Sequence, residues 1–271
     1  MPTSTRADVG IRPYGIDGGK KYMGKVLEIC VDSLASARAA IAGGADRLEL
    51  CSALLAGGLT PYEALLRQIR AESDISIRCL MRPRAGDFLY TAEELELLRL
   101  QILQLKAAGA DGFVLGCLTT EGELDKAAMK PLIEACGDRG ITLHRAIDVS
   151  RSLEQTYLDA AELGIDTVLT SGGAASCHKG MAVIERLIAL REQHNGPEVL
   201  IGAGVNAAVI REFRSAIPGA RAFHMSGKTE LESGMRFRRE GVPMGLPGLD
   251  EWHIQQTGKA AVTAARAAMD E

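Results

Sequence analysis

One short loop places two arginines and an aspartate close together in the sequence. Arg82, Arg84 and Asp87 follow an apolar run that ends at Met81, and Pro83 separates the two arginines. Proline donates no backbone hydrogen bond and biases the preceding residue toward extended backbone, so we expect a β-strand to end here. In α/β folds ligands bind beyond the carboxyl ends of strands, which predicts an anion-binding loop. The alternative is a solvated loop whose charges pair with one another.

Acidic and imidazole side chains stand near the ends of other expected strands. Glu28 and Glu49 lie in the first two strands, while His144 ends the fifth strand and Arg145 and Asp148 follow it. Two carboxylates in a confined site raise the pKa of one of them, unless arginines neutralise both. The two glutamates, with His144 and Asp148, are therefore the candidates for acid–base catalysis. The competing interpretation is an ion-pair network that only fills the top of the fold.

Six cysteines are scattered along the chain without a CxxC pair or a disulfide-like spacing. This pattern predicts reduced thiols in a cytoplasmic protein. Cys30 and Cys51 share the alternation of Glu28 and Glu49. In matching register, the two strands would hold both thiols, and both glutamates, within about 5 Å of backbone separation.

Two such thiolates suit Cu(I), whereas zinc would require more ligands and no tight Cys/His cluster stands in the sequence. Alternatively, Cys30 and Cys51 do not bind a metal and are small, buried, apolar side chains.

The last three expected strands end in small residues: Ser171-Gly172-Gly173, Gly202-Ala203-Gly204 and Ser226-Gly227-Lys228. Barrel enzymes often use backbone amides after the seventh and eighth strands to hold a phosphate, but glycine is also what a tight turn needs. The candidate ligand-binding residues are therefore Arg82, Arg84, Asp87, Arg145, Ser171, Gly204 and Ser226.

An internal repeat in the sequence predicts the strands and helices that must position these residues. Glycine, a small or apolar residue and aspartate precede an apolar run at 44–46, 109–111 and 164–166, and a weaker copy with arginine occupies 219–221. Each interval between two copies of the repeat is long enough for a helix, a further strand and a second helix. Eight strands alternating with helices predict a single-domain (βα)8 TIM barrel over residues 25–271. An open doubly wound sheet is the alternative, but no GxGxxG opening is present.

The expected strands are 26–31, 47–51, 77–81, 112–115, 141–144, 167–170, 199–202 and 222–225. Thr60-Pro61-Tyr62-Glu63 predicts a capping box at the start of the second helix. A polar segment at 233–248 is expected either to fold over the mouth of the barrel or to meet a neighbouring subunit.

The composition is that of an ordinary globular protein, with 46% hydrophobic and 24% charged residues and a net charge of −4. The mildly acidic balance argues against nucleic-acid or anionic-membrane binding. No apolar run approaches the roughly 18 residues of a membrane span. Residues 1–24 are predicted to be a flexible extension and carry no apolar segment typical of a secretory signal.

With these motifs in place, the sequence closely resembles the CutC family of copper homeostasis proteins. The matching segments run in order along the chain: 27–30, 44–51, 57–61, 82–90, 144–148, 169–172, 202–204 and 233–238. Ala85 and Ile147 depart mildly from the family pattern, and Met225-Ser226-Gly227 departs further. The resemblance implies a cytoplasmic homo-oligomer of barrel fold whose Cys30 and Cys51 bind Cu(I).

Copper binding does not account for the convergence of arginine, glutamate, histidine and aspartate at the mouth of the barrel. The alternative function is therefore an enzyme acting on a small phosphorylated or carboxylated metabolite. Arg82 and Arg84 would hold its anionic group, Glu28 or Glu49 would act as base, and His144 as acid. A third interpretation is an oligomeric scaffold without a ligand.

Overall fold

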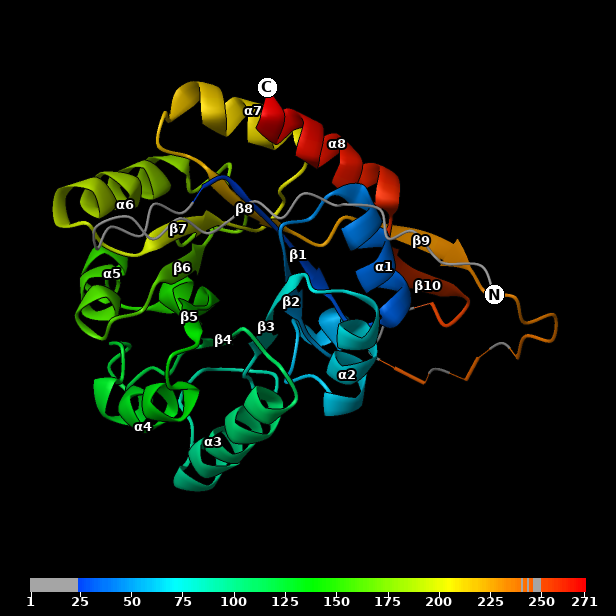
Figure 1. Cartoon of the computed structure of the whole chain (residues 1–271), viewed down its shortest axis with the longest axis horizontal. Helices are drawn as coiled ribbons and strands as arrows, with labels where there is room; N and C mark the ends of the chain where they lie inside the picture. The colour runs from blue at the N-terminus through cyan, green and yellow to red at the C-terminus, as the bar shows by residue number, and fades with distance from the viewer. Residues whose placement is uncertain (1–23, 240, 243, 246–249) are drawn as a thin grey trace, which may run out of the picture.

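The eight predicted strands close into one parallel barrel in the computed structural model, which describes residues 24–239, 241–242, 244–245 and 250–271 (Figure 1). Each strand pairs with the next along the chain, and the eighth pairs with the first. The strands are β1 (Val26–Val31), β2 (Arg47–Leu50), β3 (Ser76–Leu80), β4 (Gly112–Leu115), β5 (Gly140–Leu143), β6 (Thr167–Thr170), β7 (Glu198–Ile201) and β8 (Ala222–Met225). The barrel prediction is confirmed.

Helices surround the barrel as expected (Figure 1). They are α1 (Leu34–Gly43), α2 (Glu63–Glu72), α3 (Ala92–Ala107), α4 (Lys126–Cys136), α5 (Leu153–Glu162), α6 (Met181–His194), α7 (Ala207–Ala216) and α8 (Lys259–Asp270). Several begin with a side chain that accepts a hydrogen bond from the first turn, as at Ser33, Asp125 and Asn206. Two short 3₁₀ helices, Leu54–Ala56 and Arg145–Val149, shape the mouth.

The capping box predicted at Thr60 is wrong. Helix α2 begins only at Glu63, and Tyr62 precedes it without a side-chain cap. The hydroxyl of Thr60 instead accepts from the backbone N–H of Arg82 at 3.0 Å and donates to the Arg82 carbonyl at 3.1 Å. Thr60 therefore fixes the backbone at the end of β3, which a local sequence pattern does not reveal.

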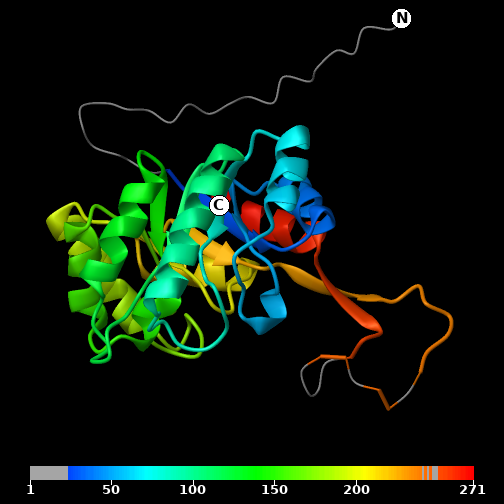
Figure 2. The ribbon, with the colours of Figure 1, turned by 90° about the horizontal axis from the view of Figure 1, so that it is seen from below.

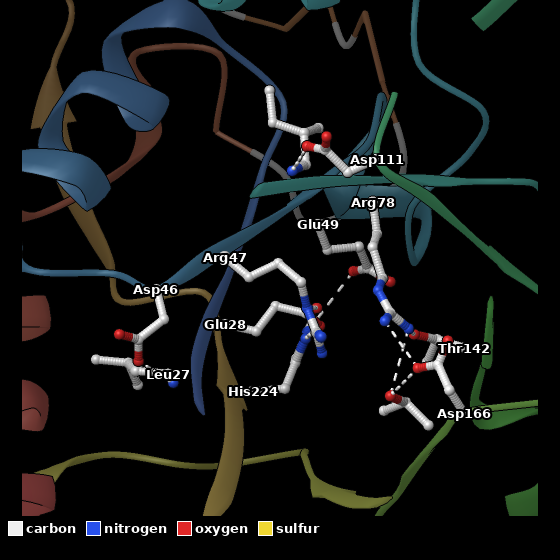
Figure 3. A network of polar contacts seen from close by, with 12 residues as sticks. Leu27, Glu28, Asp46, Arg47, Glu49, Arg78, Asp111, Thr142, Asp166 and His224 are labelled. Carbon is white, nitrogen blue, oxygen red and sulfur yellow. Dashed lines mark hydrogen bonds and ion pairs between the residues drawn. The ribbon is translucent and has the colours of Figure 1, made fainter. Parts of the chain in front are cut away.

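Alternation along the strands divides the buried side chains into two sets. One parity, including Leu27, Ile29 and Phe113, belongs to the large apolar core that also contains helix residues such as Leu66. The other parity fills the inside of the barrel. Its apolar members form two small clusters: Val26, Leu169, Leu200 and Ala222 in one, and Cys30, Cys51, Leu80 and Val114 in the other. The buried side chains of Glu28, Arg47, Glu49 and Arg78 share this interior parity (Figure 3).

The repeated aspartates join strands in pairs. Each one stands just before an even-numbered strand, and its carboxylate accepts from the backbone N–H of a residue on the preceding odd-numbered strand. Figure 3 shows the contact of Asp46 with Leu27. The bonds run from Leu27 to Asp46 at 2.8 Å, from Ile77 to Asp111 at 2.8 Å and from Ile141 to Asp166 at 2.6 Å. In the weaker copy, Arg221 pairs with Glu198 of β7. The repeat thus joins neighbouring strands in pairs at the ends where they begin.

A two-stranded antiparallel ribbon extends from the barrel after β8. Strands β9 (Lys228–Glu232) and β10 (His253–Thr257) form it, and Figure 2 shows it projecting well away from the barrel. We call the ribbon and the described residues between its strands the arm. Apart from Lys228, none of the described arm residues lines the cavity that opens at the carboxyl ends of the barrel strands. The arm therefore does not fold over the mouth, which leaves contact with another subunit as the remaining expectation.

The predicted N-terminal extension lies outside the described residues except for Gly24. Among the helices of the described part, none combines the length and the apolar character needed to cross a bilayer.

Candidate functional site

A cavity of about 670 Å³ opens where the strands of the barrel end. Most of the candidate residues line it: Cys30, Glu49, Cys51, Arg82, His144, Arg145, Asp148, Gly204 and Ser226. Four others do not: Glu28, Arg84, Asp87 and Ser171. The cavity lies within the size range of small-molecule sites.

The matching register expected for the first two strands is wrong. Cys30 of β1 is paired with Glu49 of β2, and Glu28 is paired with Arg47. Closing a sheet into a barrel staggers neighbouring strands, so equivalent positions do not lie side by side. Cys51 stands one residue beyond β2, and its backbone N–H donates to the carbonyl of Val31. Cys30 and Cys51 still share the upper apolar cluster inside the barrel.

The stagger creates a cluster that the sequence did not reveal. One ligand atom each from Cys30, Glu49 and His224 lie within 4.8 Å of one another. The imidazole Nε2 of His224 is 3.7 Å from a carboxylate oxygen of Glu49. The position of His224 on the eighth strand was evident in the sequence, but only barrel closure brings β8 against β1.

The buried carboxylate of Glu28 fixes the imidazole of His224 from the barrel interior. Glu28 accepts a hydrogen bond at 2.8 Å from Nδ1 of His224, and its other oxygen forms an ion pair with Arg47 (Figure 3). Burial by itself would raise the pKa of Glu28, but Arg47 and His224 lower it to about 2. The ionised carboxylate therefore fixes the ring with Nε2 directed toward Glu49 and Cys30.

The charges of the cluster depend on one another. Burial alone would lower the pKa of His224, but its contacts with Cys30, Glu49 and Glu28 hold that pKa well above the ordinary value. Burial raises the pKa of Glu49, against the lowering effect of His224. This buried group of acids around one imidazole is therefore stabilised by a positive charge that they share, whether a proton or a cation supplies it.

The Cys51 thiol lies beside this cluster. Its Sγ donates to a carboxylate oxygen of Glu49 at 3.5 Å. Burial, with the nearby Glu49 carboxylate and Cys30, raises the pKa of the thiol well above its usual value. In the ligand-free protein Cys51 is therefore a protonated hydrogen-bond donor.

The two arginines of the mouth loop occupy different environments. Arg82 lines the cavity, and its guanidinium donates to the carbonyls of Ala56, Gly58 and Gly86 and stacks on Phe88 at 5.4 Å. Its Nε is buried without a hydrogen-bond partner among the described residues.

Arg84 instead turns outward. It pairs with Asp87 at 2.9 Å and with Glu94 at 2.6 Å, and Asp87 is 68% exposed. The expectation that charges of this loop pair with one another is therefore met by these two residues, whereas Arg82 faces the cavity.

His144 packs into the cavity wall as a neutral imidazole. Burial and the charge of Arg82 lower its pKa to about 3. Its Nδ1 accepts from the N–H of Ala146 at 3.2 Å, so the ring proton resides on Nε2, which has no partner among the described residues. A Cβ at Gly116 would lie 2.8 Å from the ring, which explains the glycine there. His144 can donate a hydrogen bond but carries no positive charge at neutral pH.

Asp148 is occupied by donors from the chain itself. Its carboxylate accepts from the hydroxyls of Thr170 and Ser171, from the N–H groups of Ser171 and Gly173, and from Arg145. Five donors leave little capacity for a proton-transfer function. Asp148 and Ser171 instead fix Arg145, which is 45% exposed at the edge of the cavity.

Comparisons with known proteins agree with this fold. The sequence profile of the CutC family matches residues 25–229. A family protein CutC from Chromobacterium violaceum is 42% identical over 250 residues, which cover 92% of this chain and 100% of that protein. The copper homeostasis protein cutC homolog of Homo sapiens is 39% identical over 223 residues, 82% of this chain and 80% of that protein.

The same relationship is visible in three dimensions. The crystal structure of a CutC protein from Streptococcus agalactiae superposes with a TM-score of 0.70 at 25% identity, covering 74% of this chain and 98% of that one. The family profile spans the strand ends that carry the cysteines, the Arg82 loop and His224. The chain belongs to the CutC family.

Proposed function

We propose that this protein handles copper in the cytoplasm and binds Cu(I) through Cys30 and Cys51. The observation that carries the proposal is the position of these two thiols, which share one buried cluster and line the same cavity. The other four cysteines do not line it. Cu(I) is a soft ion that prefers thiolate ligands and accepts low coordination numbers. The name of the human relative, a copper homeostasis protein, supports this function.

Copper is the cargo in this proposal, and the donors present fit it. The Cys51 thiol is protonated in the ligand-free protein, so binding must release its proton to solvent. The walls around the thiols, Leu80 and Val114, are apolar and suit an ion that sheds its water.

An anaerobic Cu(I) titration against a competing chelator tests the proposal. We expect tight one-to-one binding that falls by about 100-fold or more in Cys51→Ser, because one of two soft ligands is replaced by a hard one. Cys177→Ala, a buried cysteine outside the cavity, is the matched control. Unchanged Cu(I) affinity in Cys51→Ser would refute the two-thiolate site.

A second candidate function, an enzyme acting on a small anionic metabolite, is favoured by a different observation. Arg82 Nε–H and His144 Nε2–H are buried donors without partners among the described residues, and both side chains belong to the wall of the same cavity. Unpaired buried donors cost free energy that a carboxylate or phosphate would recover. Arg82 would contact the anion, His144 would donate a neutral hydrogen bond, and Glu49 would act as base.

Thermal-shift and calorimetric measurements with carboxylated and phosphorylated metabolites test this function. The chain offers a matched pair: Arg82→Ala removes a cavity residue, while Arg84→Ala removes a neighbour that points outward. We expect ligand binding to be lost in the first variant and kept in the second. A ligand that binds both variants equally would contradict the assignment of Arg82.

We further propose that the chain functions as a homo-oligomer through the arm. The arm exposes Leu231, Met235, Phe237 and Ile254, with Phe237 68% exposed. An isolated two-stranded ribbon is marginally stable in water, so a partner that covers these side chains would stabilise it. Analytical ultracentrifugation of Phe237→Asp should show a smaller assembly than the wild type. An identical sedimentation profile would argue against the arm as the interface.

A further inference from the structure

We propose that Cys30, Glu49 and His224 form a binding site for a divalent cation of the zinc type, with one coordination position open to the cavity. This site differs from the Cu(I) site proposed above, with which it shares only Cys30. It rests on four features of the structure: the spacing of the three ligand atoms, the partner of His224, the chemistry of the donors and the access to the cavity.

The spacing is close to that of a bound ion. Ligand atoms in a tetrahedral zinc site lie about 3.3–3.8 Å apart, because the bonds to the metal are about 2.0–2.3 Å long. Nε2 of His224 and Oε2 of Glu49 are already 3.7 Å apart, and all three ligand atoms lie within 4.8 Å of one another. Small side-chain adjustments would complete the triangle, with the backbone register Cys30 to Glu49 unchanged.

His224 has the partner that a metal-bound histidine requires. Its Nδ1 is hydrogen-bonded to Glu28 at 2.8 Å, and Glu28 is anchored by Arg47 (Figure 3). A carboxylate on one ring nitrogen fixes the orientation of the imidazole and increases the basicity of the other nitrogen. Glu28 is fully buried and does not line the cavity, so positioning His224 is the function its location allows.

The donors match a borderline divalent ion better than a monovalent soft one. One thiolate, one carboxylate and one imidazole are all ordinary zinc ligands, whereas a carboxylate is a poor ligand for Cu(I). The thiolate and the carboxylate together neutralise a charge of +2. Cys51 stands outside the triangle and donates to Glu49 at 3.5 Å, so it supports that ligand without coordinating.

Three protein ligands leave a tetrahedral ion with one free position, which is the arrangement of catalytic rather than structural zinc sites. Cys30, Glu49 and His224 all line the cavity of about 670 Å³. The free position therefore faces the space that the side chains of Arg82 and His144 also line. An oxygen-bearing anion is the class of small ligand that could contact both the ion and these two side chains.

The test is a Zn²⁺ titration of the reduced, metal-free full-length chain against a chromophoric chelator, with Co²⁺ as a spectroscopic probe. We expect one equivalent to bind, and Co²⁺ to show a thiolate charge-transfer band with the strong visible absorption of tetrahedral cobalt. His224→Ala and Glu49→Gln should each weaken Zn²⁺ binding by about 100-fold, and the positioning variant Glu28→Gln by about 10–100-fold. Cys177→Ala is the control outside the cavity.

The outcomes separate this proposal from the Cu(I) proposal. Cys51→Ser retains a hydroxyl donor to Glu49, so it should lower Cu(I) affinity at least about tenfold more than Zn²⁺ affinity. Circular dichroism checks folding, and if His224→Ala does not fold, Glu49→Gln alone decides. Failure of the wild type to bind one Zn²⁺, or unchanged Zn²⁺ affinity in Glu49→Gln, would overturn the divalent site. Neither result would affect a two-thiolate Cu(I) site.

Discussion

Two groups of buried charge lie inside the same barrel, and they differ in what surrounds them. In the first, Arg78 of β3 pairs with Asp166 at 2.7 Å and donates to Thr142 at 2.6 Å. In the second, Glu28 and Arg47 support His224 next to Glu49 and Cys30. The residues of the first group do not line the cavity, whereas Glu49, Cys30 and His224 do.

Glycines close the space around the first group. A Cβ at Gly112 would lie 2.9 Å from Arg78 Cγ, and one at Gly140 would lie 2.6 Å from its Nη2. Glycine at both positions therefore leaves the space that the Arg78 side chain occupies. The second group is not enclosed in this way, because Glu49, Cys30 and His224 border the cavity. Buried charge by itself is therefore not a mark of function in this barrel; buried charge that faces an open space is.

The largest effect on stability is expected from the closed group. Arg78→Ala leaves Asp166 buried without its ion pair, which should reduce the free energy of unfolding by about 3–5 kcal/mol. Urea denaturation followed by circular dichroism measures the loss, and the Zn²⁺ affinity of the folded fraction should not change. A loss below about 1 kcal/mol would remove the distinction between the two groups.

A second prediction concerns acid stability and His144. Its pKa in the folded state is about 3, below the 6.5 of an unperturbed histidine, so the unfolded state binds more protons between these values. Stability should therefore be complete above pH 6.5 and fall as the pH decreases toward 3. From pH 7 to pH 5 this one group should cost about 2 kcal/mol. Urea midpoints across this range test it, and His144→Gln should show a flatter profile than the wild type.

The open group should behave in the opposite way to Arg78. Burial raises the pKa of Glu49, so its ionised form is not favoured by the fold. Glu49→Gln should change the free energy of unfolding by less than about 1 kcal/mol, although it removes a proposed metal ligand. Parallel urea and Zn²⁺ titrations measure both quantities. A large loss of stability would place Glu49 with the structural charges.

The smallest effect is expected at Arg84. Its partners Asp87 and Glu94 lie outside the cavity, and exposed ion pairs contribute little. Arg84→Ala should leave the melting temperature within error of the wild type, whereas Arg82→Ala should lower it. Arg82 holds three loop carbonyls, at Ala56, Gly58 and Gly86, and these lose their donor. Equal melting temperatures for the two variants would contradict this difference.

The sequence predicted the barrel because its signals are local and repeated. Alternation within each strand, helix caps and the spaced aspartates each depend on a few neighbouring residues, and all agree with one topology. Cys30, Glu49 and Cys51 share the alternation read from the sequence and line one cavity, whereas Glu28, of the same parity, does not.

The contacts within the site could not be predicted because they depend on the stagger between strands. A register offset by two residues replaced a Cys30–Cys51 pair with a Cys30–Glu49 pair. The pairing of β8 with β1 then brought in His224, which lies 194 residues after Cys30 (224 − 30) in the sequence. Likewise, the bond between Thr60 and Arg82 joins two loops, so a capping motif was the only local interpretation available.

The aspartates that join strands in pairs have a consequence for how such a protein can change over evolutionary time. Three nearly identical contacts, made by Asp46, Asp111 and Asp166, lie at the ends where strands begin, while the ends where strands finish carry different side chains in every unit. Assembly and ligand choice are thus encoded in separate positions of each unit. Substitutions at the ends where strands finish can therefore change which ligand binds, while the aspartate contacts that support the barrel at the other end stay the same.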